Sequence, residues 1–382
     1  MQLTQNLQKG LSLVEVMIAM VIGSVITAGI IQLFVANSET HRLMLGQSRM
    51  QESARFALQF IGRSVRQAGY RGCFSSNDEL HTTIDPVGNI PYEYNLNLGV
   101  EGYEGMGVGV WFPVLSTLPR TSGNGKNDTN VYSTGAGEGE GNGIVIDTVV
   151  SGSDVITLRG MEQQDLEARL INLLGDGDDI VVNVPAGGLN LLTDHLAVIH
   201  DCEKATIFRV TFANNNSPVA GQMTIGHDTD DTDAVANSDD TLALKNAFDT
   251  DASVTAIVSS TFFIAPGVGE SSQGDNPLSL WWKSGLAAPV ELVEGVEDLQ
   301  FLYGVTKNDD TVPNLYLMAS EIADWKEVTT IRVTIVVNSV DDVGGTSTPT
   351  HGCDIQNCYE DEDFDGLIRR SFTQTIQLRN TS

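Results

Sequence analysis

Basic residues are scarce in this chain of 382 residues. It carries 21 lysines and arginines against 50 aspartates and glutamates, which gives a formal net charge of −29. A surface of this sign repels nucleic acid and anionic lipid headgroups. The composition therefore argues against a direct nucleic-acid receptor. The simpler interpretation is that the negative charge keeps the protein soluble in salty surroundings. Apolar residues make up 41% of the chain, which is enough for a packed core.

Motifs of catalysis are lacking as well. None of the six histidines stands at a zinc-binding spacing from a cysteine. The chain contains no GxSxG nucleophile motif, no P-loop and no HExxH motif. A Ser/His/Asp triad drawn from distant segments would leave no such signature, but no pattern points to one. We therefore expect no enzymatic activity and no bound cofactor, with a calcium ion at residues 361–366 as the one exception.

Charge is almost missing from residues 10–36, where Glu15 is the single ionisable side chain. The 26 residues after Gly10 exceed the roughly 20 that an α-helix needs to cross a bilayer. A carboxylate inside such a segment is costly and usually marks a function. With Lys9 on the cytoplasmic side, the rest of the chain would lie in the periplasm. The alternative is a plain signal anchor that tolerates one glutamate.

The helix is expected to continue beyond the membrane surface. No proline occurs from residue 37 to residue 68, and Gly69 is a plausible C-terminal cap. Apolar residues recur at the spacing of one helix face, at Met50, Ala54, Ala57, Leu58, Ile61, Val65 and Ala68. The pattern predicts a helix from Leu11 to about Ala68. Its transmembrane and assembly half is residues 11–36, and its amphipathic half, with the cap, is residues 37–70.

Residues 71–382 are expected to form one β-rich head. Short β-branched segments predict strands, at 144–150, 154–160, 179–184, 196–201, 205–212, 254–265, 278–283, 289–293, 293–305, 325–340 and 370–380. Gly-rich segments at 121–130 and 133–143, and the acidic segment 226–251, are predicted loops. One long helix followed by strands predicts an α+β fold, with an antiparallel sheet packed on the outer half of the helix.

The start of the apolar stretch reads Gly10, Leu11, Ser12, Leu13, Val14, Glu15. It resembles the class III leader of type IV prepilins and pseudopilins, except that Leu11 stands where phenylalanine is commonest. The resemblance implies that residues 1–10 are a leader removed by a prepilin peptidase, and that the new amino group of Leu11 is methylated. It also implies that Glu15 pairs with the terminal amine of a neighbouring subunit during assembly.

Two further regions resemble PilW-type minor pilins. In the helix and just after it the matching residues are Glu52, Arg55, Phe56, Ala57, Leu58, Ala68, Gly69, Tyr70, Arg71, Gly72 and Cys73. In the C-terminal part they are Val293, Glu294, Gly295, Val296, Asp298, Leu299, Gln300, Tyr303, Trp325, Val328, Ile331, Arg332, Val333, Leu378, Arg379 and Asn380. The resemblance implies a type IV pilin-like fold with large loop insertions.

The PilW resemblance also implies a role. Such a protein would sit in the inner membrane before assembly and in the pilus fibre afterwards, at or near the tip, where it helps to initiate the fibre. Its partners would be other minor pilins, the major pilin, the inner-membrane assembly platform and a large tip adhesin. A J-type minor pseudopilin of a type II secretion system shares the leader and helix. The chain could also be a tip module for adhesion to a surface or a sugar, or an enzyme on a pilin anchor.

Cysteines are few, at Cys73, Cys202, Cys353 and Cys358, and four cysteines allow three pairings. Cys353 and Cys358 lie five residues apart, which suits a small local ring. A bond between Cys73 and Cys202 would then tie the end of the helix to a strand of the head. Two disulfides are expected in an oxidising compartment, and a metal site at the C-x4-C spacing has weaker support.

Asp361, Asp363 and Asp365, followed by Gly366, form the first half of an EF-hand loop. The glutamate of the twelfth loop position is missing, and Phe372 stands there. The segment is either an acidic turn or a calcium site that uses only the first half of the EF-hand loop.

Overall fold

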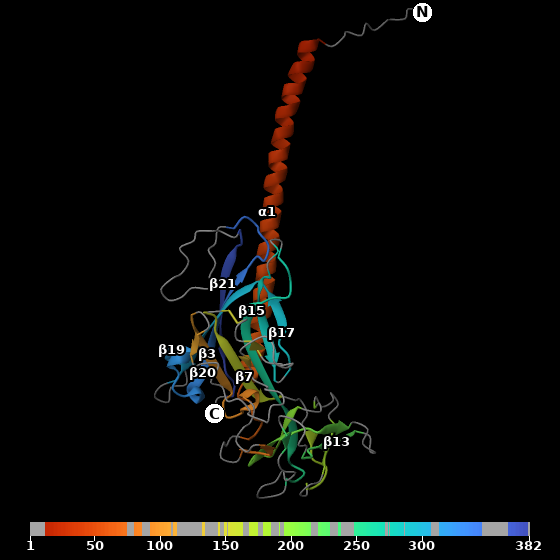
Figure 1. The fold of residues 1–382 in the computed structure, drawn as a ribbon, viewed down its shortest axis with the longest axis vertical. Coiled ribbons are helices and arrows are strands. Elements are labelled where there is room, and N and C mark those ends of the chain that lie inside the picture. The colour runs from red at the N-terminus through yellow and green to blue at the C-terminus, as the bar shows by residue number, and fades with distance from the viewer. Residues whose placement is uncertain are drawn as a thin grey trace, which may run out of the picture.

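The computed structural model describes most of the chain. The residues described are 12–74, 80–85, 92–107, 110–112, 132–133, 144–145, 149–150, 152–162, 168–174, 179–184, 191, 195–214, 221–229, 236–237, 248–271, 274, 276–285, 287–306, 313–345 and 366–380. Figure 1 shows one long helix whose N-terminal half projects from a head made of strands.

The helix, α1, runs over Leu13–Gln67 and has 55 residues, so it is about 82 Å long at 1.5 Å per residue. Six of the seven residues predicted to form its apolar face are buried, and Leu58 is half-buried against the same core. The helix ends at Gln67 and is followed by the C-cap Ala68 and then by Gly69, whose φ of +75° makes it the expected left-handed residue. The amphipathic half is therefore a helix for the predicted reason: one face packs on the head.

Within the described residues, ten strands form the largest sheet, and its main path is β1-β11-β10-β15-β7-β3-β4. The bounds on this path are β1 Leu80–Thr82, β11 Ala205–Arg209, β10 Leu196–His200, β15 Ser253–Pro266, β7 Val155–Met161, β3 Val100–Gly107 and β4 Val110–Phe112. The others are β16 Leu278–Ser284, β17 Val290–Glu294 and β8 Ala168–Arg169. Its pairs are antiparallel except β1 with β11. The predicted meander is confirmed by β15, β16 and β17, which pair in that order.

A second sheet, of order β19-β18-β20-β21, covers the helix together with the large sheet. Its strands are β19 Leu315–Leu317, β18 Val296–Val305, β20 Val328–Asn338 and β21 Arg369–Gln377. Short 3-10 turns among the described residues are η1 Tyr92–Tyr94, η4 Ala319–Glu321 and η5 Trp325–Glu327. One hydrophobic core joins both sheets to the buried face of α1, from Met50 to Ala68. The expected antiparallel sheet on the outer half of the helix is thus present.

The described residues between β7 and β15, within 162–252, make up what we call the distal module. Besides β8, β10 and β11 they include β9 Ile180–Asn183, β12 Phe212–Asn214, β13 Gln222–Gly226 and β14 Ala236–Asn237. Strands β12, β13 and β9 form a small sheet, and β14 pairs with β2 Ile84–Asp85. The module has a core of its own, which includes Phe208 and Phe248. Figure 1 shows β13 at the end of the molecule opposite the N-terminus.

Some strands differ from the sequence prediction. Strands β3 and β4 lie within residues 100–112, where no strand was predicted, and their Tyr103 and Trp111 are buried in a third core. The predicted strand 205–212 is broken after Arg209, and the predicted strand from Trp325 begins as η5. Strands β5 Tyr132–Ser133 and β6 Ile144–Val145 pair in parallel.

Candidate functional site

The N-terminal half of α1 is the most exposed apolar surface of the described chain. Every residue from 12 to 36 is exposed, and Leu13, Met20 and Phe34 each keep more than two thirds of their surface. This part is long and apolar enough to cross a membrane, and none of it is buried by the head. Because exposed apolar surface on this scale is unfavourable in water, a bilayer or other subunits must cover it.

Glu15 lies in the first turn of this surface. One carboxylate oxygen accepts a hydrogen bond from the backbone N–H of Ser12 at 3.0 Å. A negative charge is favourable at a helix N-terminus, so the carboxylate suits its place even without a partner subunit. Gly10 and Leu11, the predicted cleavage and methylation residues, lie outside the described residues, as does the leader. The structure therefore places Glu15 at the start of the exposed helix.

The other end of α1 is where the two PilW-like regions meet. The Gly69 N–H donates to the carbonyl of Arg159 at 2.8 Å, and the Asn380 side-chain amide donates to the carbonyl of Ala68 at 3.4 Å. A side chain at Gly69 would come within 2.4 Å of the Asn380 carbonyl oxygen, so glycine is needed for space as well as for its positive φ. These motif residues therefore fasten the helix end to the last residues of the described chain.

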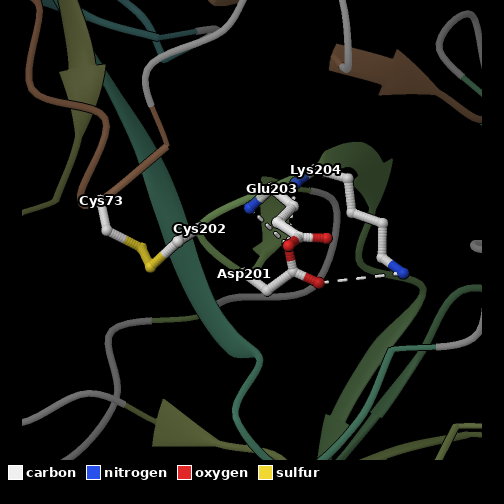
Figure 2. The surroundings of a disulfide bond; sticks show 5 residues. All are labelled: Cys73, Asp201, Cys202, Glu203 and Lys204. Carbon is white, nitrogen blue, oxygen red and sulfur yellow. Dashed lines mark hydrogen bonds and ion pairs between the residues drawn. A yellow bond between two sulfur atoms is a disulfide. The ribbon is translucent and has the colours of Figure 1, made fainter.

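A disulfide joins Cys73, just after the helix, to Cys202, in the turn between β10 and β11 (Figure 2). The same turn is held by Asp201, whose carboxylate accepts the backbone N–H groups of Glu203 and Lys204, each at 2.8 Å. The prediction for this pair is confirmed, and the bond ties the distal module to the helix end. Cys353 and Cys358 lie outside the described residues, and so do Asp361, Asp363 and Asp365.

Buried ion pairs brace the head around the helix, and the sequence reasoning did not assign them. Glu297 is 1% exposed and accepts two hydrogen bonds from Arg369, at 2.7 and 2.8 Å, and one from Asn338 at 2.8 Å. Arg159 forms another ion pair, through one hydrogen bond from its Nη2 to a carboxylate oxygen of Glu101 at 2.9 Å. In the sequence, Glu297 stands between Val296 and Asp298, two residues of the C-terminal PilW-like region.

Two buried carboxyls, Glu104 and Asp154, and the half-buried carboxyl of Asp298 lie at the junction of the two sheets. Burial, with Glu104 close by, raises the pKa of Asp154 well above its usual range, although its oxygens accept the N–H groups of Gly105 and Phe301 at 2.9 and 2.8 Å. Burial also raises the pKa of Glu104 and of Asp298. Among the described residues no group of three or more His, Cys, Asp or Glu side chains could hold a metal ion.

Two family models match the chain. The model described as Type IV Pilus-assembly protein W matches residues 266–380, and that of the prokaryotic N-terminal methylation motif matches residues 5–31. Over these residues the chain is similar to PilW-type pilins. No curated protein and no solved structure matches it. The first match covers the region from the end of β15 to Asn380, and the second covers Gly10, Leu11 and Glu15.

The two matches both name motifs of pilus proteins. The first match is to a family of type IV pilus assembly, and the methylation motif together with the apolar helix indicates a membrane anchor before assembly. The matched families are those of structural pilus proteins, which interact with other pilus components.

Proposed function

We propose that this pilin is a minor pilin of the pilus tip that helps to start the fibre. The observation that carries the proposal is the uncovered apolar half of α1, with one carboxylate in its first turn. A helix of this kind fits a bundle of neighbouring helices. Cleavage after Gly10 would free the amine of Leu11, and Glu15 of one subunit would pair with that amine of its neighbour. In a water-poor bundle such a pair favours one stagger between subunits.

The distal module supports a place at the tip. Helices that run parallel and staggered put the next subunit toward the tip near the C-terminal end of this helix. The module adds bulk there, at the end of the molecule opposite the N-terminus (Figure 1). It leaves less room for a subunit above than a head without it would leave. The partners we propose are the other minor pilins, the major pilin, the prepilin peptidase, the assembly platform and a large tip adhesin.

The assembly role is tested by Glu15→Leu. The variant should be cleaved and stable in the inner membrane yet absent from sheared fibres, because loss of one partner of a buried ion pair costs about 3–5 kcal/mol. Glu15→Asp, which shortens the side chain by one methylene, should give an intermediate defect. Gln32→Leu is the matched control, since Gln32 is another exposed polar residue of the apolar half, and it should assemble normally. Normal amounts of the Glu15→Leu variant in fibres would contradict the proposal.

The tip position is tested separately with an epitope inserted at Gly221. This residue lies in a turn of the distal module, with open space around it and a φ of +83°. Gold particles on sheared pili should mark one end of each fibre. Particles spaced along the shaft would reject the tip position and leave the assembly role intact.

A further inference from the structure

A pocket of about 310 Å³ lies between the last turns of α1 and the large sheet. Phe60 and Arg63 contribute to it from the helix, Glu162 from the end of β7, Ser259 from β15 and Trp282 from β16. Its volume is at the lower end of the range of small-molecule sites. The pocket is separate from the exposed apolar half of the helix. It adjoins the cluster around Gly69 and Asn380 that fastens the helix end, because Ala68 and Arg159 belong to both.

Three of the residues that line this pocket have a buried polar atom with no hydrogen-bond partner among the described residues. They are the carboxylate oxygen Oε2 of Glu162, the hydroxyl of Ser259 and the indole N–H of Trp282. Ser259 is only 3% exposed. Folded proteins pair the large majority of such atoms, and each exception calls for an explanation. Three exceptions around one cavity point to a ligand that pairs them.

The chemistry of these groups selects the ligand. The indole N–H and the exposed guanidinium of Arg63 only donate, whereas an ionised Glu162 only accepts. A simple anion would be repelled by Glu162, and a simple cation would face Arg63 and the indole N–H. A hydroxyl group both donates and accepts, so a ligand with several hydroxyls can satisfy all of these groups and the Ser259 hydroxyl.

The pocket also has an apolar wall. The rings of Phe60 and Trp282 lie edge to face with centroids 5.3 Å apart. Such a wall fits the C–H face of a ring that carries hydroxyls at its edge. We propose that this pocket binds a single sugar ring. This assignment does not rest on the tip position or on fibre assembly.

The test is a titration of the purified full-length protein with D-glucose, D-mannose and N-acetyl-D-glucosamine, followed by saturation-transfer NMR and calorimetry. Glycylglycine serves as a probe for a peptide amide, which also donates and accepts. At least one sugar should bind. Trp282→Phe keeps an aromatic ring and removes the N–H, so it should weaken binding of that sugar by about tenfold, the effect of one lost hydrogen bond. Ser259→Ala should also weaken binding of that sugar.

The neighbouring Trp281 provides the matched control. Its indole N–H already donates to the carbonyl of Ala265 at 3.3 Å, and it does not line the pocket. Trp281→Phe should lower the thermal midpoint and leave sugar affinity unchanged. Trp282→Phe should lower the affinity and should lower the midpoint less than Trp281→Phe does, because the N–H that it removes lacks a protein partner. The proposal is overturned if no sugar binds, if both variants bind equally well, or if glycylglycine is preferred.

Discussion

Breaking the Cys73–Cys202 bond should remove the largest single constraint on the unfolded chain. The bond spans a sequence separation of 129 residues. In the chain-entropy model a loop of this length contributes about 5 kcal/mol to the free energy of unfolding at 25 °C. The predicted Cys353–Cys358 bond would close a loop of six residues, for which the same expression gives about 2 kcal/mol. The two bonds therefore differ in expected effect by about 3 kcal/mol.

Two double variants measure this difference in the full-length protein. One carries Cys73→Ser with Cys202→Ser, and the other carries Cys353→Ser with Cys358→Ser. Urea unfolding in detergent, followed by tryptophan fluorescence, should give the larger loss of stability in the first variant. The location of the bond gives a second readout. Because Cys202 belongs to the distal module, limited proteolysis should cut that module sooner in the first variant.

Equal losses in the two double variants would refute the loop-length reasoning. A loss below about 1 kcal/mol in the first variant would do the same. Peptide mapping under non-reducing conditions checks the premise, and four free thiols in periplasmic material would refute both bonds.

Three other predictions follow from named residues. Gly10→Leu should leave an uncleaved precursor in the membrane, and mass spectrometry that finds Leu11 as the N-terminus would contradict this. Glu297→Ala should cost about 3–5 kcal/mol by stranding Arg369, whereas Asp341→Ala at the exposed pair with Arg49 should cost under about 1 kcal/mol; urea midpoints compare the two. A folded-state pKa raised above the unfolded value means that the folded state holds its proton more tightly. The contribution of Asp154 to stability should therefore fall as the pH rises through its folded-state pKa, and acidification from neutral pH should stabilise the wild type more than Asp154→Asn in thermal melts.

The helix and its cap could be predicted because their signals are local. Periodic apolar residues, the lack of proline and Gly69 at the end are read from one segment, and the strands of the C-terminal part alternate in the same local way. The break after Arg209 could not be predicted. The backbone N–H and C=O of Arg209 are both bonded to the side chain of Asn237, each at 2.8 Å, and Asn237 lies 28 residues further along. Strand β3 was missed for a similar reason, because its Tyr103 is buried by distant strands.

The candidate sites also differ in whether their signal is local or depends on the fold. The predicted cleavage and assembly residues, from Gly10 to Glu15, lie at the start of one helix, so a short sequence motif is enough to identify them. The motif residues at Gly69 and Asn380 were found by resemblance, but their purpose is visible only where the Asn380 amide reaches Ala68 across 312 residues of sequence. The sugar pocket has no motif at all. Its groups come from α1, β7, β15 and β16, and a serine or a tryptophan is unremarkable until the fold shows that its polar atom is buried without a partner. A site of that kind is defined by unmet hydrogen bonds, which exist only in the folded chain.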